Sequence, residues 1–106
     1  MLAGQNQISE KELALPFYPG SRSLRDQKFD QNGKTTLVCV RTTVDDSATA
    51  IDFYKEKIEV DGRGVLRDAD GQVALYGRLA NGRKVSVKAG SAKEGGSTVS
   101  IVVEQP

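Results

Sequence analysis

The sequence predicts the α+β class: a four- or five-stranded antiparallel sheet with one long helix packed on one face, in the order β-β-α-β-β-β. Three observations favour this class. Residues 45–58 have apolar side chains at helical spacing, whereas several other segments are β-branched or alternate between apolar and polar. Most of these other segments are joined by short turns with Asn-Gly or Asp-Gly, as in antiparallel hairpins. We therefore expect a single domain over residues 9–106, preceded by a flexible tail over residues 1–8.

The composition argues against several classes of function. The net charge of +1 gives no bulk attraction for nucleic acid or acidic lipid. Histidine is absent, which removes the commonest general base and metal ligand. The single cysteine, Cys39, cannot form an internal disulfide, and no apolar run is long enough to form a transmembrane helix.

A short N-terminal helical turn is expected before Pro16, which ends it because proline has no amide hydrogen. Ser9 is placed to accept a hydrogen bond from the amide of Glu12. Ile8 and Leu13 have the spacing of a hydrophobic staple. The turn is therefore predicted to dock on the core through its apolar side chains.

The stretch LPFYPGSRS, residues 15–23, places Phe17 and Tyr18 between two prolines. The prolines hold the backbone extended, so the two rings point to different sides. An aromatic in this setting is more often an anchor at the edge of the core than a ligand platform. We expect one or both rings to be that anchor, and the sequence leaves open which one.

The first two strands are expected at residues 21–29 and 35–44, which are joined by a turn containing Asn-Gly. A three-residue loop over residues 31–33 would place Leu24 opposite Val40. A two-residue turn is the alternative.

The long helix is expected at residues 45–58. Asp45 or Asp46 caps its N-terminus, where acidic groups suit the helix dipole. One face carries the apolar side chains and must lie on a sheet. These side chains are Ala50, Ile51, Tyr54 and Ile58.

The rest of the chain reads as β structure, with residues 64–68 as an uncertain strand after a turn at Asp61-Gly62. A three-residue loop at Ala80-Asn81-Gly82, with its glycine left-handed, keeps the apolar side chains of the flanking strands on one face. This loop pairs Leu75 with Val87. The three strands expected here cover residues 73–79, 83–89 and 98–104.

The candidate catalytic and metal-binding residues each have a structural explanation that we favour. Cys39 has no histidine to activate it, so we interpret it as a partly buried strand residue. Asp52, Glu56 and Glu59 share a helical face that is better explained by solvation than by a metal ion. The DADGQ stretch fails the spacing of a calcium loop, and GRLANGRK lacks the helix of a phosphate loop. We expect no catalytic residue, no cofactor and no metal ligand.

The solvent face of the sheet is the candidate functional surface. We expect Val38 and Val40 to point toward the helix, and Leu37, Cys39 and Arg41 to point away from it. The strands are net basic and the helix is net acidic, which predicts an electrically two-sided molecule. The predicted partner-binding residues are Arg41, Tyr76, Arg78, Lys84 and Lys88.

The order of motifs resembles a group of small uncharacterised bacterial exported proteins and lipoproteins. That group shares a proline-tyrosine-proline-glycine opening, a strand ending in threonines, and an aspartate-serine-capped helix carrying Phe-Tyr. The stretch LAG at residues 2–4 is similar to the end of a lipobox, with Gln5 at the position of the lipidated cysteine. The matching residues are Pro16, Tyr18, Pro19, Gly20, Asp46, Ser47, Phe53 and Tyr54.

The resemblance implies a periplasmic or otherwise exported protein, with a lipid anchor upstream as an option and no membrane span. Together with the basic face, it favours a non-enzymatic envelope module that binds a protein or anionic partner through its sheet. The alternative is a domain that binds single-stranded nucleic acid, for which Tyr76 would be the stacking platform. An enzyme is the least favoured hypothesis.

Overall fold

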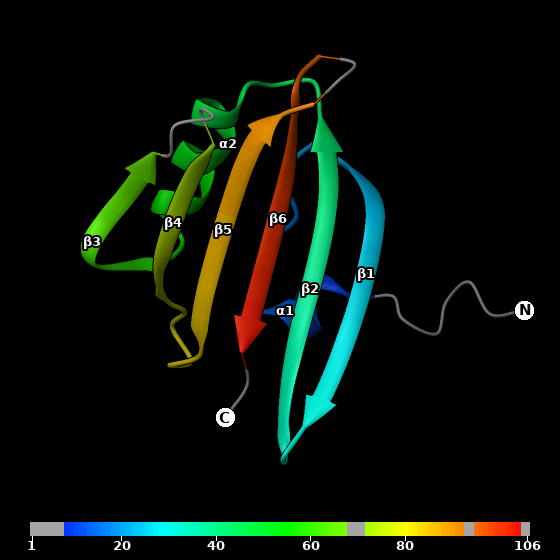
Figure 1. The fold of residues 1–106 in the computed structure, drawn as a ribbon, viewed down its shortest axis with the longest axis vertical. Helices are drawn as coiled ribbons and strands as arrows, with labels where there is room; N and C mark the ends of the chain where they lie inside the picture. The colour runs from blue at the N-terminus through cyan, green and yellow to red at the C-terminus, as the bar shows by residue number, and fades with distance from the viewer. Residues whose placement is uncertain (1–7, 68–71, 93–94, 105–106) are drawn as a thin grey trace, which may run out of the picture.

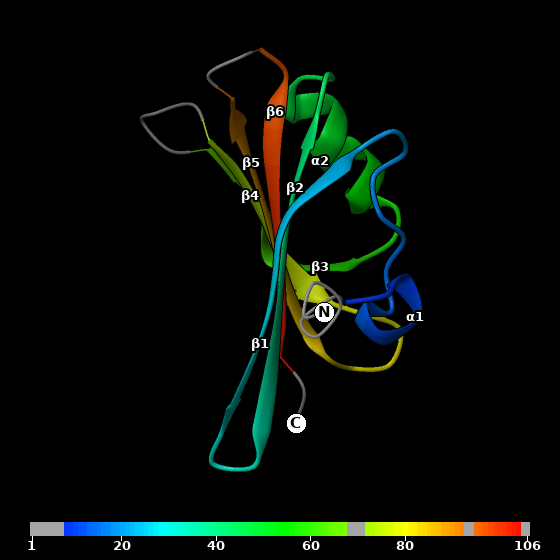
Figure 2. The same ribbon diagram turned by 90° about the vertical axis from the view of Figure 1, so that its right-hand side faces the viewer.

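Six antiparallel strands form one sheet, and two short helices lie on the same side of it (Figures 1 and 2). The computed structural model describes residues 8–67, 72–92 and 95–104. Residues 1–7 of the predicted tail and all of the DADGQ turn except Gln72 lie outside this part of the chain. The elements are α1 (Glu10–Leu13), β1 (Arg22–Gln31), β2 (Lys34–Thr43), α2 (Ser47–Lys55), β3 (Glu59–Arg67), β4 (Val73–Arg78), β5 (Lys84–Ser91) and β6 (Ser97–Glu104).

The strand order β1-β2-β6-β5-β4-β3 confirms the α+β class and the antiparallel sheet, but the sheet has six strands rather than four or five. The additional strand is β3, where the sequence predicted a turn at Asp61-Gly62 and an uncertain strand. β3 pairs with β4 at both of its ends, with a register shift between Val60 and Val65. A shift of this kind breaks the alternation of side chains, which is why the sequence pattern did not show one strand.

The helix on the sheet is shorter than predicted: α2 has nine residues, instead of one long helix over residues 45–58. Of the two candidate caps, Asp46 is the N-cap, and its side chain accepts a hydrogen bond from the amide of Thr49 at 2.8 Å. The helix ends early because β3 begins at Glu59 and the chain must turn first. Ile58, the last residue of the predicted apolar stripe, lies beyond the helix and is nevertheless buried.

The face of the sheet that the helices cover is called the inner face, and the opposite face the outer face (Figure 2). Helix α2 packs on β4, β5 and β6. Every second side chain of these strands points into the core between helix and sheet. The buried apolar inner-face side chains of β4, β5 and β6 are Val73, Leu75, Val85, Val87, Ala89, Val99, Ile101 and Val103.

The orientation predicted for β2 is wrong. Leu37 and Cys39 are fully buried on the inner face, whereas Val38 and Val40 lie on the outer face. The register explains the difference, because Leu37 pairs with Val103 and Cys39 with Ile101, both of which face the helices. Both alternating sets of β2 are apolar, so the sequence pattern alone could not fix the phase.

The two predicted hairpin loops have different outcomes. The β1–β2 turn has two residues, Asn32 and Gly33, both with positive φ, and it pairs Gln31 with Lys34. The three-residue loop expected here is therefore wrong, and Arg25 rather than Leu24 faces Val40. The β4–β5 loop is confirmed. Its glycine, Gly82, has φ +87°, the amide of Leu79 donates to the carbonyl of Arg83 at 2.9 Å, and Leu75 pairs with Val87.

The N-terminal segment closes one end of the core on the inner face. Ser9 caps α1 by accepting from the amide of Glu12 at 3.1 Å, as predicted, and Ile8, Leu13 and Leu15 are buried. Tyr18 is the buried anchor, with 7% of its surface exposed, and its ring meets Phe53 edge-on at 5.2 Å.

Hydrogen bonds fix this segment in place. The Tyr18 hydroxyl donates to the carboxylate of Asp45, and this bond raises the pKa of Tyr18 to about 12. The buried Tyr54 hydroxyl donates to the carbonyl of Pro16 at 2.9 Å. The aromatic opening motif is therefore part of the chain's own core.

Candidate interaction surface

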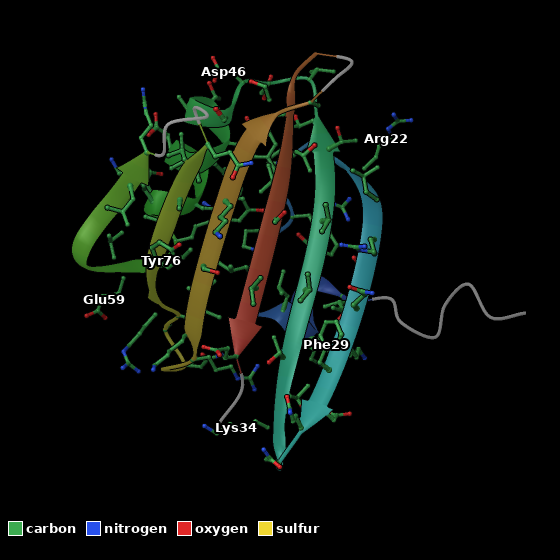
Figure 3. The ribbon with its side chains drawn as sticks, viewed as in Figure 1. Arg22, Phe29, Lys34, Asp46, Glu59 and Tyr76 are labelled. Carbon is green, nitrogen blue, oxygen red and sulfur yellow. The ribbon has the colours of Figure 1, made fainter. Side chains whose placement is uncertain are left out.

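No helix covers the outer face among the described residues, and the strand registers arrange its side chains in rows that run across the strands (Figure 3). Three rows matter for function. The charged row contains Phe29, Thr36, Glu104, Lys84, Arg78 and Glu59. The middle row contains Gln27, Val38, Val102, Ser86 and Tyr76. The lysine row contains Arg25, Val40, Ser100, Lys88, Ala74 and Leu66.

The charged row balances its own charges. Lys84 and Arg78 are neighbours, and Glu104 lies beyond one of them and Glu59 beyond the other. The Arg78 guanidinium also donates to the carbonyl of Gly82 at 3.2 Å, which draws it toward its own hairpin. Two of the predicted partner-binding residues, Arg78 and Lys84, therefore lie on the outer face beside compensating carboxylates.

Among the described residues, the lysine row carries positive charge without acidic neighbours. Lys88 is exposed between Ser100 and Ala74. Arg25 lies at the other end of the row beside Val40, and the exposed Arg22 precedes it on the same edge strand. Among the described side chains, the excess positive charge of the outer face is thus concentrated on Lys88 and on the two arginines of β1.

Three hollows on this face are each lined by Tyr76, by Lys88 or by both. An open concavity of about 460 Å³ is lined by Tyr76, Lys84 and Val102, among others. A second hollow, of about 200 Å³, lies between Tyr76 and Lys88, and a third, of about 150 Å³, lies between Lys88 and Ser100. The first two hollows are lined by both apolar and cationic side chains, whereas the third is lined by Lys88, polar side chains and a glycine.

Arg41, the fifth predicted residue, is not on the outer face. It pairs with Val99 on the inner face, and its guanidinium lies 4.0 Å from the centre of the Phe17 ring. Its Nε and Nη2 atoms donate to Ser21 at 2.8 and 3.0 Å. The misassigned phase of β2 explains the error, because Arg41 alternates with Val40. Arg41 holds the N-terminal segment against the sheet.

Cys39 lies in a strand, as predicted, but it is fully buried on the inner face rather than partly buried. No part of its surface is exposed, and burial together with the nearby Asp26 carboxylate raises its pKa to about 12. A thiol that stays protonated at neutral pH is a poor nucleophile. The Oδ2 atom of Asp26 accepts a hydrogen bond from the amide of Ile8 at 2.9 Å, which gives this carboxylate a structural use.

Residues 8–67, 72–92 and 95–104 contain neither a cluster of metal ligands nor a membrane-spanning helix. Within them, no three histidine, cysteine or acidic residues are grouped in a way that could hold a metal ion. None of the helices described is long and apolar enough to cross a bilayer.

Several residues lie on the outer face that the sequence pattern did not place there: Arg22, Arg25, Phe29, Val38 and Val40. The two-residue length of the Asn-Gly turn was the signal that could have placed the β1 residues. Comparison with protein-family models, curated proteins and solved structures found no match.

Proposed function

We propose that this protein is a non-enzymatic binding module whose ligand surface is the outer face of the sheet, and that its partner is a protein with an acidic surface. The observation that carries the proposal is the pairing of uncompensated cations with half-buried apolar side chains on an uncovered sheet. Lys88 and Arg25 flank Val40 and Ser100 along the lysine row. A mixed surface of this kind suits a protein partner with carboxylates around an apolar centre.

Single-stranded nucleic acid is less well supported as the ligand. Successive bases need neighbouring aromatic platforms. The aromatic side chains of the described outer face are Tyr76 on β4 and Phe29 on β1, and β2, β6 and β5 lie between these two strands in the sheet (Figure 3). The charged row also carries carboxylates that would repel a phosphate backbone.

The test compares two double charge reversals in capture from an envelope extract, with the captured proteins identified by mass spectrometry. Lys84→Glu/Lys88→Glu reverses charge on the outer face. Lys11→Glu/Lys55→Glu makes the same change at exposed positions on the helices. We expect the first pair to lose an acidic partner that the wild type and the second pair retain.

Equal capture by all three proteins would refute the outer face as the binding surface. Retention of a single-stranded oligonucleotide at low salt, lost at moderate salt, would instead favour the nucleic-acid alternative.

Export to the envelope, expected from the resemblance, is also part of the proposal. A signal sequence encoded upstream of Leu2 would support it. Recovery of the full-length gene product from the cytosolic fraction alone would contradict it.

A further inference from the structure

We propose that the open edge of β1 pairs with β1 of a second copy of this chain, in an antiparallel register centred on Gln27. This inference rests on the backbone and charge pattern of one strand and is independent of the proposed function. β1 is an edge strand that pairs only with β2 within the described part of the chain (Figure 1). Two of its apolar side chains, Leu24 and Phe29, are 59% and 50% exposed.

The turn geometry shows which backbone groups of β1 face the open edge. In a hairpin with a two-residue loop, the closing pair exchanges two hydrogen bonds, and every second pair does the same. Here the closing pair is Gln31 and Lys34. The amides and carbonyls of Asp26, Lys28 and Asp30 therefore point away from β2 and are available to another strand.

Charge selects the register of a symmetric pairing. Two antiparallel copies of β1 related by a two-fold axis perpendicular to the sheet must pair even-numbered residues with even-numbered residues along this edge. A register centred on Asp26 sets two aspartates against each other, and one centred on Lys28 sets two lysines together. Centring on Gln27 places Asp26 opposite Lys28 of the second copy, and this pair occurs twice.

The same register also forms a favourable contact between the two copies on the outer face. Arg25 then lies opposite Phe29 of the second copy, where a guanidinium packs favourably on an aromatic ring. A register centred on Phe29 also matches opposite charges, but it overlaps residues 27–31 only.

The charged side chains of β1 protect the edge against other strands, since charges on an edge discourage unselective pairing. The same charges accept a second copy, because only a strand with the reversed order of signs matches them. Lys28 also forms an ion pair with Glu12 of α1 at 2.8 Å, on the inner face of the sheet. One paired strand from each copy gives a small interface, so we expect weak, concentration-dependent dimerisation.

The test is a heterodimer exchange followed by analytical ultracentrifugation up to millimolar protein. Lys28→Glu places two acidic pairs in its own dimer, and Asp26→Lys places two basic pairs in its own. We expect the wild type to dimerise, each variant alone to remain monomeric, and an equal mixture of the two variants to dimerise. Lys34→Glu, at the hairpin tip outside the overlap, is the matched control and should dimerise like the wild type.

A wild type that stays monomeric throughout, or a Lys28→Glu variant that dimerises normally, would overturn the proposal. Because Asp26 also accepts the amide of Ile8, circular dichroism must show that Asp26→Lys folds. Amide hydrogen exchange in the wild type gives a measurement without substitution. The amides of Asp26 and Lys28 should become protected as concentration rises, and exchange independent of concentration would refute the pairing.

Discussion

The aromatic pair in the opening motif yields the sharpest test of the fold. The sequence left open whether Phe17 or Tyr18 anchors the segment, and the structure assigns the role to Tyr18. Removing a buried aromatic side chain costs about 3–5 kcal/mol, so we expect Tyr18→Ala to fall in that range. Phe17 is only half-buried, under the Arg41 guanidinium. Phe17→Ala should cost about 1–2 kcal/mol, from partial burial and a cation–π contact.

Urea denaturation at neutral pH, followed by circular dichroism, measures both changes in the free energy of unfolding. Tyr18→Phe separates the ring from its hydroxyl, and losing a hydrogen bond to a charged acceptor should cost about 1.5–3 kcal/mol. A double-mutant cycle with Asp45→Asn isolates that bond. The assignment fails if Phe17→Ala destabilises the protein as much as Tyr18→Ala.

Three further outcomes follow from buried groups. The folded state raises the pKa of Tyr18 from 10.0 to about 12, so the folded protein retains a proton that the unfolded chain releases. The free energy of unfolding should therefore fall between about pH 10 and pH 12. Urea midpoints across that range should show a less steep fall in Tyr18→Phe. Cys39 should resist alkylation by iodoacetamide in the folded protein and react fully in denaturant, so rapid labelling under native conditions would contradict its burial. A methyl group at Gly77 would overlap the carbonyl oxygen of Glu59 and lie 2.7 Å from Cγ2 of Ile58. Gly77→Ala should therefore lower the free energy of unfolding by about 3 kcal/mol or more. A melting temperature like that of the wild type would show that β3 is misplaced.

The parts of the fold that the sequence predicted are those with a single consistent pattern. Val85 and Val87 alternate with polar residues, so their strand had one possible phase, and it is confirmed. β2 has two apolar phases, and only pairing with β6 selects the one that buries Leu37 and Cys39. The position of Arg41 depended on that choice.

The charges of the candidate surface also depend on strand pairing that the sequence pattern does not determine. Composition and alternation placed Lys84 and Lys88 on the outer face, as the structure does. The sequence could not show that Lys84 pairs with Glu104 while Lys88 pairs with Ser100, because these partners come from the register of distant strands. Net charge along the chain was therefore a poor guide to where the positive charge is uncompensated.

The position of β6 has a consequence for how the molecule assembles. β6 is the last described strand in the sequence, yet it lies between β2 and β5 in the sheet. Until the ribosome has released this segment, the β1–β2 hairpin and the β3–β4–β5 meander have no strand between them to join them into one sheet. Contacts between residues so far apart in sequence slow folding, because a long loop must close before they form. We therefore expect the two parts of the sheet to join only after β6 has been synthesised.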